Sequence, residues 1–363
     1  VIFMPSIEGG GVEKNLFIIS NYLAKKIKGT HLITADKNYN KKFKNIRIIN
    51  SLLNVKQGSS RKYKYVLCLY ELIKLIIKDK KITVFAFQAN FYCVIICKIF
   101  FNVNLITRSN SSPSGWSQNF LKKEIFKFLF KLIDCVIVNS QDFKKEIKKR
   151  FNVSSVCIYN PLNLYEIKKL SKKKTSFSFF KNSPELKIIN VGRYVEQKDQ
   201  ITLLKALNIV NKKIKFKAVI MGRGILKEKL ISFIKKNKLT KKIKLVAFQH
   251  NPFKYIKLSD LFVLSSKFEG LPNVLLESIV LEKFIISANC PTGPREILSN
   301  GKGGELYKVG DFNALAKKIL YFNNNKTKLL KKIKYAQSQL YRFNKIENLN
   351  NYYNIIQKYL LYK

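Results

Sequence analysis

Hydrophobic and polar positions along the first 160 residues follow a pattern that predicts parallel strands separated by helices. Short β-rich runs recur, and the stretches between them carry apolar residues at helical spacing. The predicted strands are residues 1–5, 31–35, 84–87, 105–110, 135–140 and 156–160, and the predicted helices are residues 12–26, 65–78, 120–133 and 142–151. Alternating strands and helices are typical of a parallel sheet that helices cover on both faces.

The same cycle starts again after a charged stretch that follows Pro161. Further strands are predicted at residues 186–192, 216–222, 244–248, 261–266 and 284–289. The pattern predicts two α/β domains of similar build. Their expected bounds are 1–165 for the first domain, 166–185 for a linker, 186–334 for the second domain and 335–363 for a helical tail that crosses back to the first domain. Ligands in open parallel sheets bind outside the carboxyl ends of the strands, so we look for a site there.

Composition narrows the class of protein only partly. The 363 residues are 47% hydrophobic, enough for two domains with cores of their own. The chain has 69 Lys and Arg residues against 22 Asp and Glu residues, a formal net charge of +47. Such an excess occurs in nucleic-acid-binding proteins and in proteins that act on anionic membranes or substrates. The surplus is mostly lysine and is evenly spread along the chain. Compositional drift toward lysine as a default surface residue produces the same pattern.

Cysteine usage and hydropathy point to the cytoplasm. The six cysteines lie mostly in apolar runs, and no His or Cys neighbours complete a metal-binding set. We interpret them as reduced core residues. The longest apolar stretch, residues 91–101, is too short to span a bilayer and contains Lys98. We see no signal peptide, and because Val1 lies inside a predicted strand we expect a few native residues to precede it.

A glycine-rich turn, GGGVEK at residues 9–14, joins the first predicted strand to the first helix. Glycines at this position let the backbone of Gly10 and Gly11 approach a ligand, and a helix N-terminus favours an anion. A second turn of this kind, MGRGILKEKL, contains Gly222. A purely structural role is the alternative for both, since glycine shapes many strand-to-helix turns.

Two cations follow the first strand of the second domain. The stretch NVGRYVEQK at 190–198 places Arg193 and Lys198 at the carboxyl end of that strand, where they suit a diphosphate. Arginine is scarce in this lysine-rich chain, and its bidentate fork favours a functional role for Arg193. A solvated charge pair is the alternative interpretation.

The stretch SSKFEGLPNVLLES at 265–278 holds two glutamates, Glu269 and Glu277, around a loop-to-helix turn. Eight helical steps would leave them roughly 80° apart and about 12 Å along the axis, so they do not pair with each other. Pro272 suits the first turn of a helix, and free N–H groups near Gly270 to Asn273 suit sugar or phosphate oxygens. A helix cap with a surface glutamate is the structural alternative.

Five motifs together resemble the retaining, GT-B type glycosyltransferases of family four, also called glycosyl transferases group 1. The motifs are FEGLPNVLLES, which resembles an E-x7-E signature, PSIEGGGVEK, VGRYVEQKD, VIMGRGILKEKL and CPTGPREIL. They match in order and spacing over nearly the whole chain, most specifically from 186 to 310. The resemblance is greatest to bacterial enzymes that extend lipid-linked glycans or surface polysaccharides. It implies a GT-B fold, in which two Rossmann-like doubly wound domains face each other across a cleft.

The resemblance also implies roles for individual residues. Arg193 and Lys198 would neutralise a departing nucleoside diphosphate without a metal or other cofactor, in agreement with the absence of a DxD sequence. Glu269 would hold hydroxyls of the transferred sugar, and Glu277 those of the ribose. The residues expected to bind the donor are Gly10, Gly11, Arg193, Lys198, Gly222, Phe248, Glu269, Gly270, Leu271, Pro272, Asn273 and Glu277, with Arg193, Lys198 and Glu269 catalytic.

One departure concerns a histidine that many family members carry in a loop of the first domain. This chain has only His31 and His250, and neither lies there. Arg108 and Asn110 occupy the region, and we expect them either to meet the donor or an acceptor phosphate, or to fix the loop by hydrogen bonds.

The partners expected are a nucleotide sugar, most simply a UDP-sugar, and a glycan or lipid-linked acceptor. Residues 120–133 place Lys123, Lys127 and Lys131 on one line, which suits either an anionic membrane surface or the solvated face of a core helix. We therefore expect a cytoplasmic hexosyltransferase, peripheral on the inner face of a bacterial plasma membrane. Two alternatives stay open: a GT-B-fold nucleotide-sugar epimerase, and a basic nucleic-acid-binding protein. The lack of a known nucleic-acid module disfavours the second, and the spacing of the acids disfavours a glycoside hydrolase.

Overall fold

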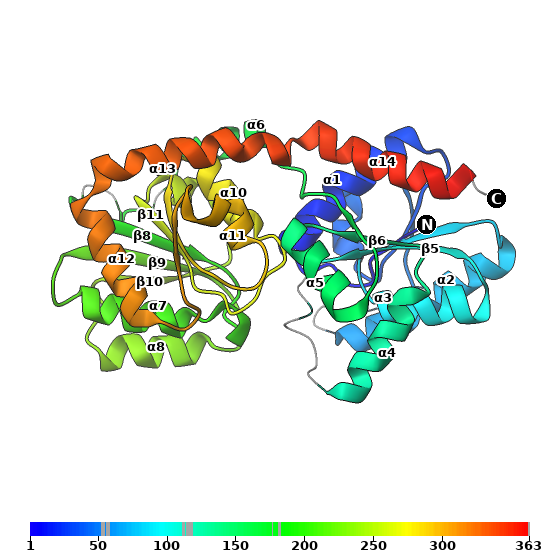
Figure 1. Cartoon of the computed structure of the whole chain (residues 1–363), viewed down its shortest axis with the longest axis horizontal. Coiled ribbons are helices and arrows are strands. Elements are labelled where there is room, and N and C mark those ends of the chain that lie inside the picture. Colours follow the sequence, from blue (N-terminus) through cyan, green and yellow to red (C-terminus); the bar gives the residue numbers. More distant parts are fainter. Residues whose placement is uncertain are drawn as a thin grey trace. The chain divides into compact units, whose positions relative to one another are not determined.

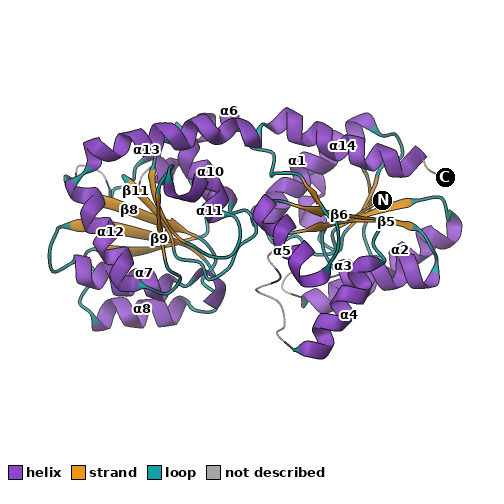
Figure 2. Ribbon diagram, in the orientation of Figure 1, coloured by secondary structure: helices purple, strands orange, loops and turns teal. Residues whose placement is uncertain are grey.

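The chain folds into two compact units. The computed structural model describes residues 1–51, 55, 59–110, 113, 119–175, 177–180 and 183–361. The first unit comprises Val1–Pro161 and Phe343–Lys363, and the second comprises Leu162–Arg342. Each unit contains one parallel sheet with helices packed on it (Figures 1 and 2).

The sheet of the first unit has seven parallel strands in the order β3-β2-β1-β4-β5-β6-β7. The strands are β1 Ile2–Phe3, β2 His31–Ile33, β3 Arg47–Ile49, β4 Thr83–Ala86, β5 Asn104–Ser109, β6 Cys135–Val138 and β7 Val156–Cys157. The pattern of apolar runs predicted all of these except β3. This edge strand starts with the exposed Arg47 and none of its three residues is buried, so it lacks a clear apolar run.

Helices cover both faces of this sheet. They are α1 Gly11–Lys26, α2 Arg61–Lys78, α3 Asn90–Val94, α4 Phe120–Lys131, α5 Gln141–Phe151 and α14 Lys345–Leu361, with the π-helix η2 Ile95–Phe100 and the 3-10 helix η1 Lys37–Lys42. Alternate residues of β4 enter different cores: Val84 packs among residues of α2, α3, α4 and α5, and Phe85 among those of α1 and α14. This alternation buries β4 on both faces, as a parallel sheet requires.

The C-terminal helix α14 belongs to the first unit. Leu349, Tyr352 and Ile356 are buried in the core beside α1, and Figure 1 shows the red helix running along α1. The carbonyl of Tyr359 accepts hydrogen bonds from the side chains of Thr83 (3.1 Å) and Asn104 (2.9 Å). The return to the first unit starts at Phe343, later than the expected residue 335, because α13 Lys326–Ser338 belongs to the second unit.

The second unit has a six-stranded parallel sheet in the order β10-β9-β8-β11-β12-β13. The strands are β8 Leu186–Val191, β9 Phe216–Gly222, β10 Ile243–Ala247, β11 Leu261–Leu264, β12 Phe284–Ala288 and β13 Glu305–Tyr307. The sequence analysis did not predict β13, another three-residue edge strand. Glu305 of β13 lies 2.5 Å from the ammonium groups of both Lys318 and Lys332.

The other elements of the second unit are short helices and turns. They are α6 Leu164–Ser171, η4 Glu196–Lys198, α7 Gln200–Val210, α8 Lys227–Lys236, α9 Phe253–Lys257, α10 Asn273–Val280, α11 Pro294–Ile297, η5 Ser299–Gly301, α12 Phe312–Asn324, α13 Lys326–Ser338 and η6 Gln339–Phe343. The range 166–185, expected as a linker, is partly integrated into this unit: α6 packs on α9 and α10, and Phe180 is buried. The Phe177 ring lies 5.0 Å from the Tyr255 ring of α9. Aromatic burial therefore outweighs the charged composition that favoured a linker.

Both sheets are doubly wound. The strand order reverses between β1 and β4 in the first sheet and between β8 and β11 in the second. At such a switch point the connections leave two neighbouring strands in opposite directions, which makes the carboxyl ends of those strands the usual place for a ligand. The two switch points therefore identify the loops to inspect.

Candidate functional site

The loops that follow β8 and β11 are hydrogen-bonded to each other at the switch point of the second sheet. The Gln197 side-chain amide donates to the Phe268 carbonyl at 2.9 Å, and the Lys267 N–H donates to the Gln197 carbonyl at 2.8 Å. The Ser265 hydroxyl donates to the Lys198 carbonyl at 2.8 Å. These contacts hold two loops far apart in the sequence in a fixed relation.

Lys198 and Glu269 form an ion pair between these two loops. The Lys198 Nζ lies 2.5 Å from Glu269 Oε1, and the side chains are 16% and 8% exposed. A charged pair in such a shielded place interacts more strongly than one in water. The topology thus brings together two of the three residues predicted to be catalytic, one a cation for an anionic group and the other an acceptor for hydroxyls.

The backbone around Gly270 is shaped by the loop after β12. The Thr292 hydroxyl donates to the Glu269 carbonyl at 2.6 Å. Gly293 has a φ of 88°, and a Cβ there would lie 2.3 Å from the Gly270 carbonyl oxygen, so only glycine fits. Pro272 occupies the position just before α10, one residue ahead of its predicted place in the first turn, and the helix starts at Asn273. Gly270, Leu271 and Pro272 are buried, and Asn273 is half-buried.

Glu277 lies in the middle of α10 and is 5% exposed. It is therefore an interior carboxylate and not the surface glutamate of the structural alternative. Since Glu269 precedes the helix, the two acids occupy separate places, as their spacing predicts.

Arg193 is exposed, and its guanidinium makes one long contact with the Gln197 side-chain oxygen at 3.4 Å. Its neighbour Tyr194 fixes the loop. The buried Tyr194 hydroxyl lies at hydrogen-bond distance from two carbonyl oxygens, those of Ile220 (2.8 Å) and Val246 (3.0 Å). Arg193 is thus presented on an anchored loop with its charge largely unengaged.

Gly222 has a packing role at the end of β9. A Cβ at Gly222 would lie 1.9 Å from the Gly192 carbonyl oxygen, so the β8 and β9 ends approach closely only because residue 222 is glycine. Phe248 follows β10 and is half-buried; its ring centre lies 5.0 Å from the Arg223 guanidinium and 5.2 Å from the His250 ring. Phe248 therefore offers an aromatic face at the far side of the same sheet edge.

In the first unit, the glycine turn is closed by an acid of its own helix. Glu13 is buried, and its carboxylate accepts hydrogen bonds from the N–H groups of Gly10 (2.8 Å) and Glu8 (3.2 Å). Gly10 and Gly11 are exposed at the start of α1. The backbone donor of Gly10 that we expected to meet an anionic ligand is thus satisfied by Glu13 in this structure.

Arg108 lies in the interior of the first unit, away from solvent. It is fully buried; its Nε donates to the Tyr352 hydroxyl at 2.8 Å, and its Nη2 donates to the Asn160 side chain at 2.6 Å. Asn110 donates to the Phe87 carbonyl at 2.9 Å. These contacts agree with the loop-fixing alternative.

Comparison with known proteins identifies the second unit. Residues 171–339 match the family described as Glycosyl transferases group 1. This segment is a group 1 glycosyltransferase domain. It contains the β8 and β11 loops, and with them the Lys198–Glu269 pair.

Two curated relatives and one solved structure extend this likeness. An uncharacterized glycosyltransferase of Methanocaldococcus jannaschii is 37% identical over 56% of this chain and 52% of that protein. A Campylobacter jejuni protein, N-acetylgalactosamine-N,N'-diacetylbacillosaminyl-diphospho-undecaprenol 4-alpha-N-acetylgalactosaminyltransferase, is 28% identical over 62% of both chains. The chain therefore matches only about half to three-fifths of the length of these relatives. The crystal structure of Anabaena HepE in complex with UDP-glucose superposes with a TM-score of 0.78 at 17% identity, over 98% of each chain, which shows the GT-B fold.

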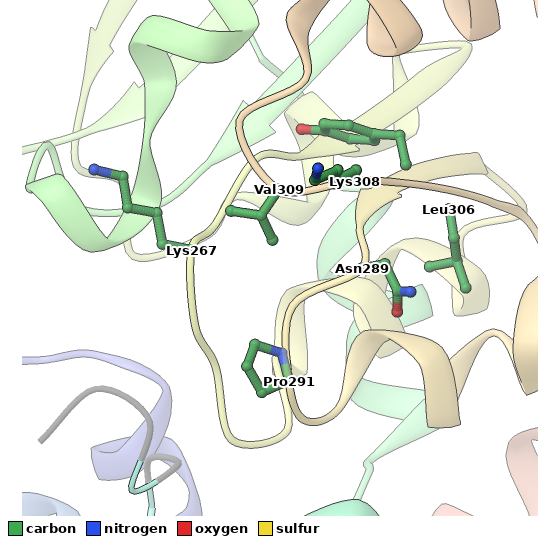
Figure 3. Close-up of a pocket in the computed structure, with 7 residues that line it drawn as sticks. Lys267, Asn289, Pro291, Leu306, Lys308 and Val309 are labelled. Carbon is green, nitrogen blue, oxygen red and sulfur yellow. The ribbon is translucent and has the colours of Figure 1, made fainter.

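A pocket of about 520 Å³ opens beside the β11 loop of the glycosyltransferase domain (Figure 3). Its walls are the segments after β11, β12 and β13, and its lining residues are Lys267, Asn289, Pro291, Leu306, Tyr307, Lys308 and Val309. It does not include Lys198 or Glu269, but it shares their supporting loops. The switch point of the sheet coincides with the Lys198–Glu269 pair and not with this pocket.

Three supporting residues escaped the sequence analysis. Glu13, Thr292 and Gly293 each shape a loop through backbone contacts. Glu13 lies in GGGVEK, where an acid three residues after a helix cap is a capping-box signal, and the other two lie in the motif CPTGPREIL. Among the described residues, no group of three or more His, Cys, Asp or Glu side chains is placed to hold a metal ion. Burial raises the pKa of the Cys68 and Cys97 thiols to about 12, so both stay protonated and unreactive.

Proposed function

We propose that this chain is a retaining glycosyltransferase that moves a hexose or N-acetylhexosamine from a nucleotide sugar, a UDP-sugar, to a glycan acceptor carried on a lipid. The observation that carries the proposal is the Lys198–Glu269 pair at the switch point of a group 1 glycosyltransferase domain. The reaction would serve the synthesis of a bacterial polysaccharide, lipopolysaccharide or related glycan.

The donor diphosphate would bind between Lys198 and Arg193. Lys198 is already held by Glu269, while Arg193 is exposed on an anchored loop, and both residues follow β8 at the same edge of the sheet. Charge-assisted bonds from fixed donors stabilise the diphosphate as it departs. No metal is needed for this neutralisation, and we propose that the enzyme is metal-independent.

The sugar and the nucleoside would bind on opposite sides of the diphosphate. Glu269 would accept hydrogen bonds from sugar hydroxyls, with backbone near Gly270 alongside, and Glu277 would do so from the ribose. Phe248 would lie near the base. The arrangement explains why two acids eight residues apart need not touch each other.

Retention is proposed from the resemblance to the retaining enzymes of family four, and since no protein nucleophile is assigned, we propose that the acceptor attacks directly. The acceptor hydroxyl oxygen would attack the anomeric carbon on the face from which the diphosphate leaves. As the bond between the anomeric carbon and the diphosphate oxygen breaks, the hydroxyl proton would pass to the departing diphosphate. Arg193 and Lys198 stabilise the negative charge of that group throughout.

The acceptor class and the location rest on a relative. The Campylobacter jejuni protein is named for a diphospho-undecaprenol-linked substrate, which supports a lipid-linked acceptor here. None of the helices within the described residues is both long and apolar enough to cross a bilayer. We propose a cytoplasmic enzyme that reaches its acceptor from the membrane surface.

The test is calorimetric titration of UDP, GDP and ADP into the parent protein, Arg193→Ala and Lys236→Ala. Lys236 is an exposed cation on α8 of the same domain and serves as the matched control. Losing one charge-assisted bond should weaken binding by about 10- to 100-fold. We expect selective UDP binding that Arg193→Ala weakens and Lys236→Ala leaves unchanged. Absence of nucleotide binding, or equal binding by both variants, would refute the proposed donor site.

A second assay addresses the transfer itself. The parent is incubated with UDP-N-acetylglucosamine or UDP-glucose and undecaprenyl-diphosphate-linked sugar, and the configuration of the new bond is read by nuclear magnetic resonance. An α-linked product from the α-linked donor is expected, and a β-linked product would refute retention. Turnover of the donor to another nucleotide sugar without acceptor would instead identify an epimerase.

A further inference from the structure

Large apolar side chains are exposed on one set of neighbouring helices in the first unit. Among the described residues, the elements α2, α3, η2 and α4 hold eleven of the 21 large hydrophobic side chains that are exposed. These eleven are Tyr63, Val66, Tyr70, Ile77, Tyr92, Ile95, Ile99, Phe100, Leu121, Ile125 and Phe128. We call them the apolar face. Contiguous exposed apolar surface with a polar rim marks an interaction site on a protein.

The helices that carry the apolar face lie side by side. Tyr65 of α2 packs against Tyr92 of α3 with ring centres 6.0 Å apart, and Phe91 of α3 stacks on Phe126 of α4 at 4.4 Å. All of them cover the same side of the first sheet, opposite α1 and α14 (Figure 1). The exposed residues therefore form one surface and not scattered positions.

On α4 and α2, several residues that face solvent are apolar, and so are the residues that face the core. On α4, Leu129 and Phe130 are buried, while Leu121, Ile125 and Phe128 follow the i, i+4, i+7 spacing of a second stripe and are 71%, 55% and 59% exposed. On α2, the exposed stripe of Val66, Tyr70 and Ile77 lies opposite the buried Cys68, Leu72 and Ile76.

Helix α5 of the same sheet provides an internal comparison. It buries Phe143, Ile147 and Phe151, and its outward positions are Lys144, Lys145, Lys148 and Lys149. Drift toward lysine therefore suffices to explain α5. It does not explain Leu, Ile and Phe at the equivalent outward positions of α4.

The apolar face lies among positive charges. α2, α3, η2 and α4 together contain ten Lys and Arg residues, five of which form ion pairs with acids. The other five are exposed: Lys62, Lys78, Lys122, Lys123 and Lys131. On α4, Lys123, Lys127 and Lys131 form a basic line beside the apolar stripe. A second copy of the chain would present the same positive surface, and two such surfaces repel each other. An anionic lipid bilayer supplies both an apolar interior and the opposite charge.

We propose that this apolar face, with its lysines, is the surface by which the first unit docks on an anionic membrane. Leu121, Ile125 and Phe128 enter the boundary between headgroups and acyl chains, and the lysines extend their ammonium groups to the lipid phosphates. The inference names the surface behind the peripheral location proposed above. It is tested without donor or acceptor, so its failure is separate from failure of the proposed activity.

The experiment is flotation of the whole chain with vesicles of phosphatidylcholine alone or mixed with phosphatidylglycerol. One variant carries Leu121→Gln, Ile125→Gln and Phe128→Gln; another carries Lys123→Gln, Lys127→Gln and Lys131→Gln. Glutamine keeps a good helix propensity, and unchanged melting curves confirm that the variants fold. Matched controls on α12 and α13 are Tyr321→Gln with Leu330→Gln, and Lys328→Gln with Lys331→Gln and Lys334→Gln, which alter exposed residues of the second unit.

We expect the parent to bind vesicles that contain phosphatidylglycerol, with binding that weakens as salt rises. Removal of three lysines from α4 should lower partitioning by about 100-fold, since each contributes about fivefold near such a surface. The apolar variant should lose at least as much, and both controls should bind like the parent. Equal loss in the controls, binding to phosphatidylcholine alone, or no binding by the parent would overturn the assignment. A parent dimer that the apolar substitutions dissociate, without vesicle binding, would also overturn it by assigning the face to a second copy.

Discussion

The Lys198–Glu269 ion pair should couple the stability of the two loops that form the candidate site. We consider Lys198→Met, Glu269→Gln and the double variant, because each removes a charge with little change in side-chain volume. At the observed separation of 2.5 Å, the Coulomb attraction is about 7 kcal/mol at an effective dielectric of about 20. Desolvation of two nearly buried charges offsets a large part of it, so the net value of the pair is small.

The cost appears when one partner is removed and the other remains buried without its counter-charge. Each single variant should lower the free energy of unfolding by about 3 kcal/mol. The double variant removes both charges and, because the net value of the pair is small, should cost only about 1 kcal/mol, clearly less than the sum of the two single variants. Such coupling would show that the tertiary contact, and not either residue alone, organises the site.

The assay is urea denaturation followed by far-ultraviolet circular dichroism, with calorimetry to separate the transitions of the two units. Lys236→Met and Glu228→Gln on α8 form the control cycle, in which single and double variants should stay within about 0.5 kcal/mol of the parent. Single variants of the pair that cost less than this, or whose effects simply add, would refute the reasoning that the pair is shielded and mutually dependent.

Three further predictions test other parts of the structure. Gly222→Ala should destabilise the second unit by at least about 3 kcal/mol in urea denaturation, because its Cβ would lie 1.9 Å from the Gly192 carbonyl oxygen. Gly192→Ala is the control and should be tolerated, because its Cβ would meet only the side-chain carbons of a lysine at 3.4 Å. A larger loss of stability in Gly192→Ala than in Gly222→Ala would contradict the packing argument. Arg108→Met should lower the unfolding free energy of the first unit by about 2–4 kcal/mol and expose α14 to proteolysis, since it leaves two buried polar partners unsatisfied; an unaltered cleavage pattern and melting curve would argue against the interior role. The third concerns Glu305: burial works against ionisation, but its two lysine partners hold the pKa of Glu305 below its ordinary value of 4.5, so its stabilising contribution is present above that pH and lost as the pH falls below it. The difference in melting temperature between parent and Glu305→Gln should therefore shrink on acidification, and a difference independent of pH would refute the assignment.

Periodicity predicted the long buried elements well and the marginal ones poorly. Strands such as β4 and β11 are buried throughout because helices cover them on both faces, so each forms an apolar run that can be predicted from the sequence. β3 and β13 are three-residue edge strands whose pairing depends on a neighbour already in place. α6 was assigned to a linker because its lysines hide an apolar stripe that only packing on α9 reveals.

The sequence by itself determined two Rossmann-like domains, and it placed Lys198 and Glu269 at strand ends. Both follow from local rules: apolar periodicity is set by burial, and polar residues that follow a parallel strand must lie at one edge of the sheet. Tertiary structure alone decided that the two side chains meet at 2.5 Å and that Arg108 is buried behind α14. It also decided that the exposed apolar residues of α2, α3, η2 and α4 lie on neighbouring helices on one side of the first sheet. These outcomes depend on contacts between segments up to 244 positions apart, which the strand order creates and which no local pattern records.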